Sequence, residues 1–500
     1  MTTLVRDSMH LNTADNVAVA LRALKAGETV DGTTLLTDVP MGHKFAVMPV
    51  AKGSPVVKYG QVMATATADI AAGEHVHVQN CAMAEEHSTE SEQRGQVHAK
   101  PERTTFEGFL RPDGRAGTRN YIGILASVNC SSTVCGAIAA EANRVLKPKY
   151  PGVDGFAPIV HDQGCGMAGS GEGFDTLVRT LKGYRDHPNF AGVLIVGLGC
   201  EVNQLTLYKR DDWTRERFQT FNIQEVGGSA SAVRRAVELL EPIAEAANRD
   251  VRETLPVSLL TLGMQCGGSD GFSGISANPA LGVASDMLVA AGGTSILSET
   301  PEIFGAEHLL IARADPETGA KIEAMIDWWR AYADRNGASL DNNPSPGNKR
   351  GGLTTILEKS LGAVAKGGLS PLSGAYAYAE RIDRPGFVYM DSPGYDPVAA
   401  TGQVASGANI IAFTTGRGSC FGAKPAPSVK LASNGALFRS MPEDMDINCG
   451  TILEEGASLE EVGRQIYDFL LDTASGKKTR SEEFGYGDNE FVPWKIGAVL

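Results

Sequence analysis

Two histidines separated by one residue, His75 and His77, give the clearest pattern for metal chemistry in this chain. The sequence around them favours a β-strand, in which alternate residues point to the same face. Both imidazoles can therefore reach one ion, and imidazole is a common metal ligand. Asn80, nearby, could assist. The alternative is an ordinary half-exposed strand face on which the two rings bind nothing.

Five of the eight cysteines stand just after a segment that we predict to be a strand. Ligands bind at the carboxyl ends of strands in open α/β sheets, so these thiols could line a site. Cysteine is also among the most buried residue types, and each one alone could be a small core residue. The absence of a C-x-x-C pair argues against a zinc ribbon or a thioredoxin-like centre. The five are Cys130, Cys165, Cys200, Cys266 and Cys420.

Basic residues in glycine-rich loops indicate a site for an anion. Residues 409–415 form an apolar, β-branched run that predicts a buried strand, and a glycine-rich turn carrying Arg417 follows at 416–422. Lys349, Arg350 and Arg119 also lie in glycine-rich loops. In an acidic chain, cations in such loops favour recognition of an anion. Ordinary solvated loop charge is the alternative.

Three further groups could act as an acid or a base: His43 and Lys44 in a turn, and His161 at the end of a predicted strand. Two glycine motifs point to other chemistry but fail on context. Residues 164–169 match G-x-G-x-x-G, yet no acidic residue follows at the spacing of about 20 that a dinucleotide site needs. Residues 267–271 match G-x-S-x-G, yet the later His308 lies in a helical pattern rather than in a triad order.

The elements that must position these residues predict an α/β chain with a small β domain in front. We expect the β domain at residues 1–82, a polar linker at 83–105, and two α/β domains with mainly parallel sheets at 106–253 and 254–500. A helix is expected at 15–24 with Asp15 as its N-cap, and residues 341–352 are too polar and broken to form an element. The tail at 490–500 contains Trp494 and is expected to pack onto the protein.

Composition narrows the class of protein. The net charge of −14 argues against a nucleic-acid surface, without excluding an anionic substrate. The first residues are polar, and no run approaches the roughly 18 apolar residues that a membrane helix needs. We therefore expect a cytoplasmic protein that contacts neither nucleic acid nor membrane, with its cysteines reduced.

Longer strings resemble the altronate/galactarate dehydratase family of sugar-acid hydro-lyases over nearly the whole chain. The first domain is similar to that family's N-terminal β-clip (SAF) domain, with matching strings at 42–44, 58–60 and 75–77. The signature continues at 114–121, 187–189, 197–201 and 343–352, and ends with Phe-Val-Pro-Trp at 491–494. One departure is Gln79, where similar sequences often continue the histidine-rich run, so a ligand supplied there is missing.

The resemblance implies elimination of water from a 2,3-dihydroxy acid to give a 2-keto-3-deoxy acid. The proton next to a carboxylate is very weakly acidic, so a divalent metal must stabilise the enediolate while a base and an acid move the protons. The family implies iron(II), replaceable by manganese. An iron–sulfur cluster on strand-end cysteines is a variant. We expect a small-molecule substrate and a homodimer.

Specific roles follow from the same resemblance. The predicted metal ligands are His75, His77, Cys266 and Cys420, and the base is His43, Lys44 or His161. The predicted substrate-binding residues are Arg119, Asn120, Lys349, Arg350 and Arg417. Because the first domain supplies histidines that the rest of the chain has in small number, we expect it to share the active site with the α/β part. The alternatives are a sulfo-lyase acting on a sulfonated hydroxy acid and a non-catalytic sugar-acid-binding protein.

Overall fold

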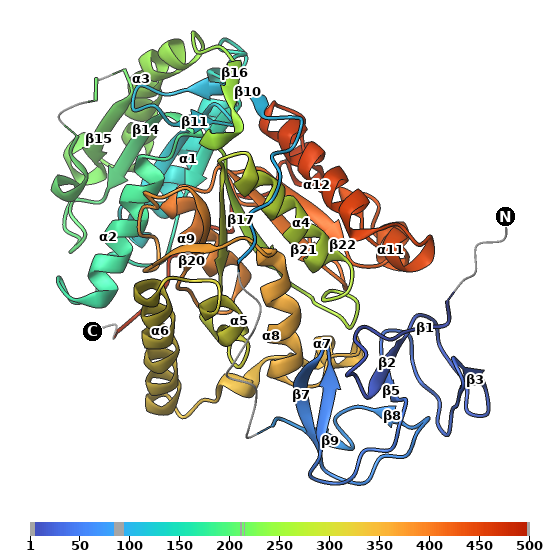
Figure 1. Cartoon of the computed structure of the whole chain (residues 1–500). Coiled ribbons are helices and arrows are strands. Elements are labelled where there is room, and N and C mark those ends of the chain that lie inside the picture. Colours follow the sequence, from blue (N-terminus) through green and yellow to red (C-terminus); the bar gives the residue numbers. More distant parts are fainter. Residues whose placement is uncertain (1–5, 85–94, 211–212, 215, 498–500) are drawn as a thin grey trace.

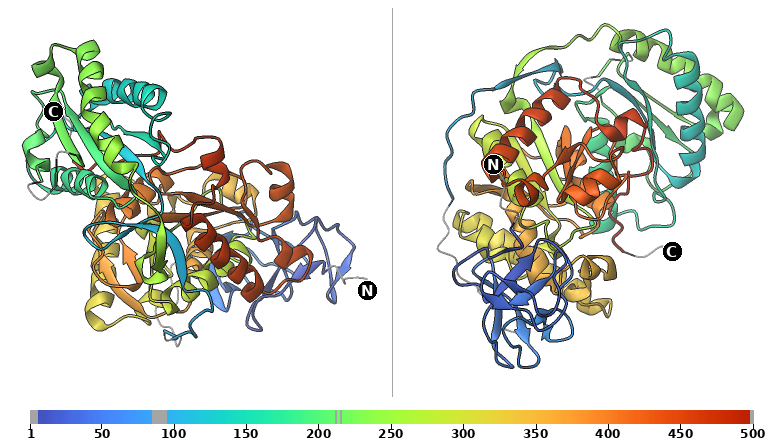
Figure 2. Two further views of the ribbon diagram at one scale, coloured as in Figure 1. Left: turned by 90° about the horizontal axis from the view of Figure 1, so that it is seen from above. Right: turned by 90° about the vertical axis from the view of Figure 1, so that its right-hand side faces the viewer.

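The computed structural model describes residues 6–84, 95–210, 213–214 and 216–497, which form three regions (Figure 1). We call them the N-terminal β domain (6–84), the middle domain (105–256) and the C-terminal domain (257–497). The C-terminal domain lies between the other two in every view (Figure 2). The predicted fold class is confirmed. Part of the predicted linker, residues 85–94, lies outside the described residues.

The N-terminal β domain is built from short antiparallel strands. One sheet has the order β1 (Ser8–Met9), β2 (Val17–Ala20), β5 (Lys44–Ala46), β8 (His75–Val76), and a second has β6 (Pro55–Lys58), β7 (Gln61–Ala66), β9 (Cys81–Ala82). The helix predicted at 15–24 is wrong. The Asp15 carboxylate accepts N–H groups of Tyr59 and Gly60 on a distant turn instead of capping a helix, and all four residues of β2 are buried in the sheet.

The middle domain has a four-stranded parallel sheet between two layers of helix. Its order is β13 (Gly155–Ile159), β12 (Tyr121–Ala126), β14 (Phe190–Gly197), β15 (Phe218–Asn222). Helices α1 (Asn129–Val145) and α3 (Ser229–Ala247) cover one face, and α2 (Glu172–Arg185) packs on the other side, against the C-terminal domain. Strands β10 (Thr105–Leu110) and β16 (Glu253–Pro256) pair where the chain enters and leaves this domain.

The C-terminal domain has a seven-stranded parallel sheet. Its order is β19 (Leu372–Tyr376), β20 (Gly386–Met390), β18 (Thr294–Ser298), β17 (Thr261–Cys266), β21 (Ile410–Thr415), β22 (Ser428–Ala432), β23 (Ile447–Asn448). The central strands are buried along their whole length, as parallel strands covered on both faces are. Helices α4 (Ala277–Ala290) and α12 (Leu459–Ala474) pack together on one face, and α9 (Asp396–Ser406) lies on the other.

The chain leaves β17 toward β18 on one side and later returns to β21 on the other. The strand order therefore reverses between β17 and β21, and open α/β sheets bind ligands at the carboxyl ends of the strands at such a point. The loops at 267–271 and 416–422 follow β17 and β21.

Four described α-helices lie between β18 and β19. They are α5 (Glu307–Ile311), α6 (Pro316–Arg335), α7 (Pro346–Arg350) and α8 (Ile356–Val364). The last two, α7 and α8, contact the N-terminal β domain. The prediction of a structureless segment at 341–352 is wrong, because Ser345 and Asn348 form a capping box that starts α7. The tail packs as expected up to residue 497: Trp494 stacks on Trp329 at 5.3 Å, and residues 498–500 lie outside the described residues. No described helix is long and apolar enough to cross a membrane.

Candidate active site

Three histidines of the N-terminal β domain converge where it meets the C-terminal domain. His43 immediately precedes β5, which pairs with β8, so Phe45 lies opposite His75. The ring centroid of His43 lies 5.1 Å from that of His75 and 4.9 Å from that of His77, and the centroids of His75 and His77 are 5.5 Å apart. We call these residues the histidine group. The predicted pair His75 and His77 is thus part of a group of three, because the pairing of β5 with β8 brings in His43, which is 32 positions from His75 in the sequence.

Backbone carbonyls of α7 orient two of these rings. Nε2 of His43 lies 3.2 Å from the Arg350 carbonyl and Nε2 of His77 lies 2.9 Å from the Lys349 carbonyl. A carbonyl can only accept, so each Nε2 carries the proton and each Nδ1 keeps its lone pair. Burial, with the neighbouring basic groups, lowers the pKa of His75 and His77 to about 4. The rings are therefore neutral near pH 7, which is the form that binds metal.

A buried ionic group ties the same domain to α8. Glu358 accepts from Lys44 at 3.0 Å and from Lys58 at 2.9 Å, and all three side chains are at most 1% exposed. Burial alone would raise the pKa of Glu358, but the two ammonium groups hold it well below its usual range. Lys44 also donates to the Gly352 carbonyl at 2.6 Å. Its ammonium is fully buried between these partners and is not open to a ligand.

Glycines allow the two domains to touch at this point. A Cβ on Gly271 would lie 2.0 Å from the Gly42 carbonyl oxygen, far inside contact distance. The Gly271 N–H donates to the Gly351 carbonyl at 2.7 Å, so the loop after β17 also contacts the turn after α7.

Three basic residues border these touching loops. Lys349 and Arg350 end α7, and Arg417 begins the turn after β21 with its Cβ against the backbone of Gly268. Within the described residues their side chains have no hydrogen bond or ion pair. We call Lys349, Arg350 and Arg417 the cationic rim. Uncompensated charge of this kind beside neutral imidazoles fits a ligand with carboxylate groups.

A second group of reactive residues lies fully enclosed at the ends of β17 and β18. Ligand atoms of Cys266, Glu299 and Glu302 lie within 4.8 Å of one another. Lys366 donates to the Cys266 sulfur at 2.8 Å, and Lys359 pairs with Glu302. We call these five residues the enclosed cluster.

Glu299 is the unusual member of the enclosed cluster. Its φ is 76°, and both carboxylate oxygens are buried without a hydrogen-bond partner among the described residues. Burial, together with Glu302, raises the pKa of Glu299 well above its usual value. Burial likewise raises the pKa of Cys266 to about 12. A cation would satisfy Glu299, but two ammonium groups already offset the charge of its neighbours, and Cys266, Glu299 and Glu302 are at most 3% exposed.

The structure divides the predicted metal ligands. The imidazoles and the Cys266 thiol do not fall within the reach of one ion in the described part of the chain. Cys420 is exposed on the turn after β21 and joins neither group. The four predicted ligands therefore do not form one site in this geometry.

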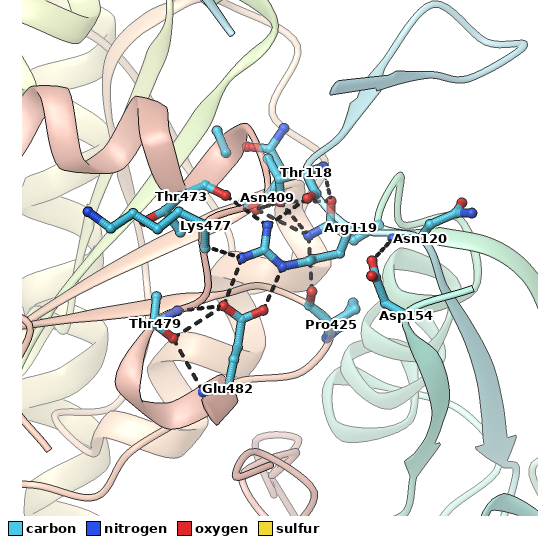
Figure 3. Close-up of polar contacts among 12 residues, drawn as sticks. Thr118, Arg119, Asn120, Asp154, Asn409, Pro425, Thr473, Lys477, Thr479 and Glu482 are labelled. Atoms are coloured by element: carbon cyan, nitrogen blue, oxygen red, sulfur yellow. Dashed lines mark hydrogen bonds and ion pairs between the residues drawn. The ribbon is translucent and has the colours of Figure 1, made fainter. Parts of the chain in front are cut away.

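Arg119, predicted to bind substrate, instead joins the middle and C-terminal domains, and Asn120, also predicted to bind substrate, is held within the middle domain (Figure 3). Arg119 is 3% exposed, and its guanidinium forms a bidentate ion pair with Glu482, with N–O distances of 2.5 and 2.7 Å. Both Asn120 side-chain N–H groups donate to backbone carbonyls of the middle domain. The other guanidinium N–H groups donate to the carbonyls of Thr118, Thr473 and Lys477. No donor of either side chain remains for a substrate.

His161, a predicted base, is also occupied by backbone. Its Nε2 lies 2.9 Å from the Ala126 carbonyl, and its Nδ1 accepts the Gln163 N–H at 3.1 Å. The ring is buried in the middle domain and has no nitrogen left to accept a proton from a substrate.

Sequence reasoning missed Glu358, Glu299, Glu302, Lys359 and Lys366. Two signals were available: Glu299 directly follows a strand-like run at 294–298, and Lys359 and Lys366 are seven residues apart, hence on one side of a helical segment. Neither signal distinguishes a buried charge from a solvated one.

The fold and these residues define an enzyme built on a parallel α/β sheet with an added β domain that supplies histidines. Comparison with known proteins then shows that the chain belongs to the altronate/galactarate dehydratase family. Models of the altronate/galactarate dehydratase SAF domain, the D-galactarate dehydratase/altronate hydrolase second domain and the D-galactarate/altronate dehydratase C-terminal domain match residues 6–84, 108–248 and 257–499. The chain is therefore a hydro-lyase.

Three relatives show the extent of the similarity. Altronate dehydratase of Bacillus subtilis (strain 168) is 35% identical over 506 residues, which cover 99% of this chain and 100% of the relative. Galactarate dehydratase (L-threo-forming) of Escherichia coli (strain K12) is 37% identical over 488 residues, 94% of this chain and 93% of the relative. The (2R)-sulfolactate sulfo-lyase subunit beta of Chromohalobacter salexigens is 33% identical over 400 residues, 78% of this chain and 96% of the relative.

Proposed function

We propose that this protein removes water from an aldonic or aldaric acid of the altronate or galactarate type and releases a 2-keto-3-deoxy acid. The observation that carries the proposal is the histidine group: three neutral imidazoles held at a domain junction beside an unpaired cationic rim. Two of the relatives named above, altronate dehydratase and galactarate dehydratase, are named for sugar acids, which fits a rim that can bind carboxylates.

The histidine group fits a divalent metal by its donor chemistry. Imidazole suits iron. The Lys349 carbonyl fixes the tautomer of His77, and Nε2 of His75 donates to Nδ1 of His43, so each of the two rings keeps an unprotonated Nδ1 as its ligand atom. His75 and His77 would hold the ion, which we propose to be iron(II), replaceable by manganese(II). When bound, the ion supplies Lewis-acid stabilisation of the enediolate. The enclosed cluster fits less well, because its two lysines offset the negative charge that a cation would require.

His43 is the base that the geometry favours among the three predicted ones. Its unprotonated Nδ1 accepts a hydrogen bond from Nε2 of His75 at 3.0 Å, a side-chain contact that a substrate can replace, whereas the partners of His161 are backbone groups. Burial lowers the pKa of His43, which keeps the ring ready to accept a proton near pH 7. The Arg350 carbonyl at Nε2 stabilises the imidazolium that forms, and this imidazolium can return the proton to the leaving hydroxyl.

The cationic rim would hold the substrate by its carboxylate. Lys349, Arg350 and Arg417 come from two loops, so an aldaric acid with a carboxylate at each end could contact both. The N-terminal β domain, packed over the loops at the carboxyl ends of β17 and β21, would exclude water from the reacting carbons. The active site is then shared between two domains. Assembly as a homodimer stays a prediction.

The experiment is a substrate screen on the full chain, purified without oxygen. Metal-stripped protein is given iron(II) and a panel of aldonic and aldaric acids, and keto-acid release is measured. His43→Gln should retain bound iron and lose turnover, His77→Ala should lose both, and the control His98→Ala, outside the histidine group, should lose neither. Wild-type turnover in His43→Gln would overturn the assignment of the base.

A second candidate is a sulfo-lyase, favoured by the similarity to the sulfolactate enzyme. Both reactions begin by removing a proton next to a carboxylate and differ in the group that leaves. Release of sulfite from a sulfonated hydroxy acid, with no keto acid from the sugar-acid panel, would select this candidate.

A further inference from the structure

Three exposed cysteines lie at one edge of the middle sheet and take no part in the proposed reaction. Cys130 is in the first turn of α1, directly after β12, whereas Cys165 follows β13 and Cys200 follows β14. These three strands are neighbours in the order β13-β12-β14 and run parallel, so their carboxyl ends meet at one edge. We call Cys130, Cys165 and Cys200 the thiol edge.

Hydrogen bonds hold the three cysteine-bearing loops against one another. The N–H of Asn129, next to Cys130, donates to the Gln163 carbonyl at 2.9 Å. The carbonyl of Gly164, next to Cys165, accepts from the N–H of Asn203 at 3.2 Å. The side chain of Glu201, next to Cys200, accepts from the Ser127 hydroxyl at 2.7 Å.

The backbone around Cys165 is shaped to bring that loop inward. Gly164 has a φ of +98°, and a Cβ there would lie 2.6 Å from the Ser127 carbonyl oxygen. Only glycine permits this approach, which sets Cys165 beside the start of α1. Ser127 is fully buried, so the thiols project from a packed base rather than from a free loop.

The separation of the thiols argues against a single ion bound by all three. A single tetrahedral ion such as zinc needs ligand sulfurs close together, at bonds of about 2.3 Å. In the described part of the chain, the three thiols are not within 4.8 Å of one another. A cluster of several irons and sulfides holds its cysteine sulfurs further apart than one ion does. Three exposed thiols converging from three strands suit such a cluster.

The start of α1 adds favourable contacts. The helix has 17 residues, its N-cap residue Val128 provides no side-chain cap, and its first turn has no acidic residue. The N–H groups of Asn129 and Ser131 already donate to carbonyls, and the other N–H groups of this turn are donors that can bind sulfur and stabilise a cluster's negative charge. The same hydrogen bonds help to set the potential of iron–sulfur centres.

We infer that the thiol edge binds an iron–sulfur cluster of the [4Fe–4S] type through Cys130, Cys165 and Cys200, leaving one iron without a cysteine ligand. Binding is a ligand exchange: three thiols lose their protons and replace three ligands of a preformed cluster, with no change in oxidation state. The inference is independent of the histidine group. Cys266, bound by Lys366, and Cys420, at the edge of the other sheet, are not part of it.

The test uses the full chain under nitrogen. A preformed [4Fe–4S] cluster with small thiolate ligands is added, the protein is desalted, and iron, sulfide and visible absorption are measured. We expect about four irons and four sulfides per chain. Cys130→Ser, Cys165→Ser and Cys200→Ser should each lose most of them, whereas Cys420→Ser, an exposed cysteine elsewhere, should not.

Two results would overturn the inference: no cluster on the wild-type chain, or equal loading in the three variants and in Cys420→Ser. Binding of zinc alone, at one ion per chain and lost in the same variants, would also reject it. Because the three thiols are exposed, the variants should keep the wild-type circular dichroism. A variant that does not is replaced by the corresponding alanine, and electron paramagnetic resonance of the reduced protein then gives a second readout of the cluster.

Discussion

Replacing Glu358 by glutamine should destabilise the junction between the N-terminal β domain and α8. The change removes the one carboxylate that Lys44 and Lys58 share and leaves two ammonium groups in a site that is at most 1% exposed. Breaking a buried pair by removing one partner costs about 3–5 kcal/mol. The protein could instead neutralise one of the two lysines at a similar cost. At about pH 7 the solution lies roughly 3.4 units below the ordinary lysine pKa of ~10.4, and at about 1.36 kcal/mol per unit the deprotonation costs about 4.6 kcal/mol.

The assay is urea unfolding followed by far-ultraviolet circular dichroism, with hydrogen exchange of α8 and the N-terminal strands to localise the effect. The chain has several domains, so transition midpoints and local exchange are compared instead of one free energy for the whole chain. Lys58→Met is the matched variant. It leaves Glu358 paired with Lys44 and should cost clearly less than Glu358→Gln. Equal midpoints for wild type and Glu358→Gln would refute the reasoning.

The pH dependence of this effect has a definite sign. The pKa of Glu358 in the folded protein lies below its value in the unfolded chain. Its contribution is therefore complete above the ordinary carboxyl pKa, about 4.3, and is lost as the pH falls through the lower folded value. The difference between wild type and Glu358→Gln should be constant from pH 8 to 6 and shrink on acidification below about pH 4.

Three further predictions concern the site. Arg417→Ala should lower kcat/KM for an anionic substrate by the free energy of a charged hydrogen bond, about 1.5–3 kcal/mol. The control Arg234→Ala, at an exposed position, should leave kcat/KM unchanged. Equal losses in the two variants would show that the effect is not specific to Arg417. Because the pKa of His75 and His77 is about 4, iron(II) binding measured by titration should persist to about pH 5, and loss already between pH 7 and 6 would contradict it. Glu299→Gln should raise the unfolding midpoint at pH 8 but not at pH 4. The pKa of Glu299 is higher in the folded protein than in the unfolded chain, so ionisation of this carboxyl at high pH favours unfolding. A lower midpoint of the variant at pH 8 would show that the carboxylate is stabilising.

Local sequence patterns predicted most of the α/β part. The run at 121–128 gives β12, and the helical pattern at 230–248 gives α3, because burial on both faces and amphipathic periodicity leave direct traces in the sequence. The helix expected at 15–24 failed because the Asp15 carboxylate binds a turn 44 residues away, which local pattern cannot reveal. The segment 341–352 concealed a short helix that only its cap defines.

The site was predictable where its chemistry lies in local spacing. His75 and His77 share a strand face, and the cations of the rim stand in glycine loops. Arg119 was misassigned because a buried arginine with all five donors used has the same sequence context as one that binds substrate. Glu302 and Lys359 were missed because their pairing joins residues 57 positions apart. Pairing of this range depends on the tertiary fold.

The most direct test of the shared site is the response of turnover to added iron(II) in metal-stripped full-length protein. Keto-acid release from the best substrate is followed in wild type, His77→Ala and the control His98→Ala. We predict that wild type and His98→Ala recover activity as iron(II) is added and that His77→Ala does not recover at any concentration, although its far-ultraviolet spectrum is unchanged. Full activity in the stripped wild type without metal, or recovery of His77→Ala along the wild-type curve, would contradict the proposal that the N-terminal β domain supplies the metal ligands.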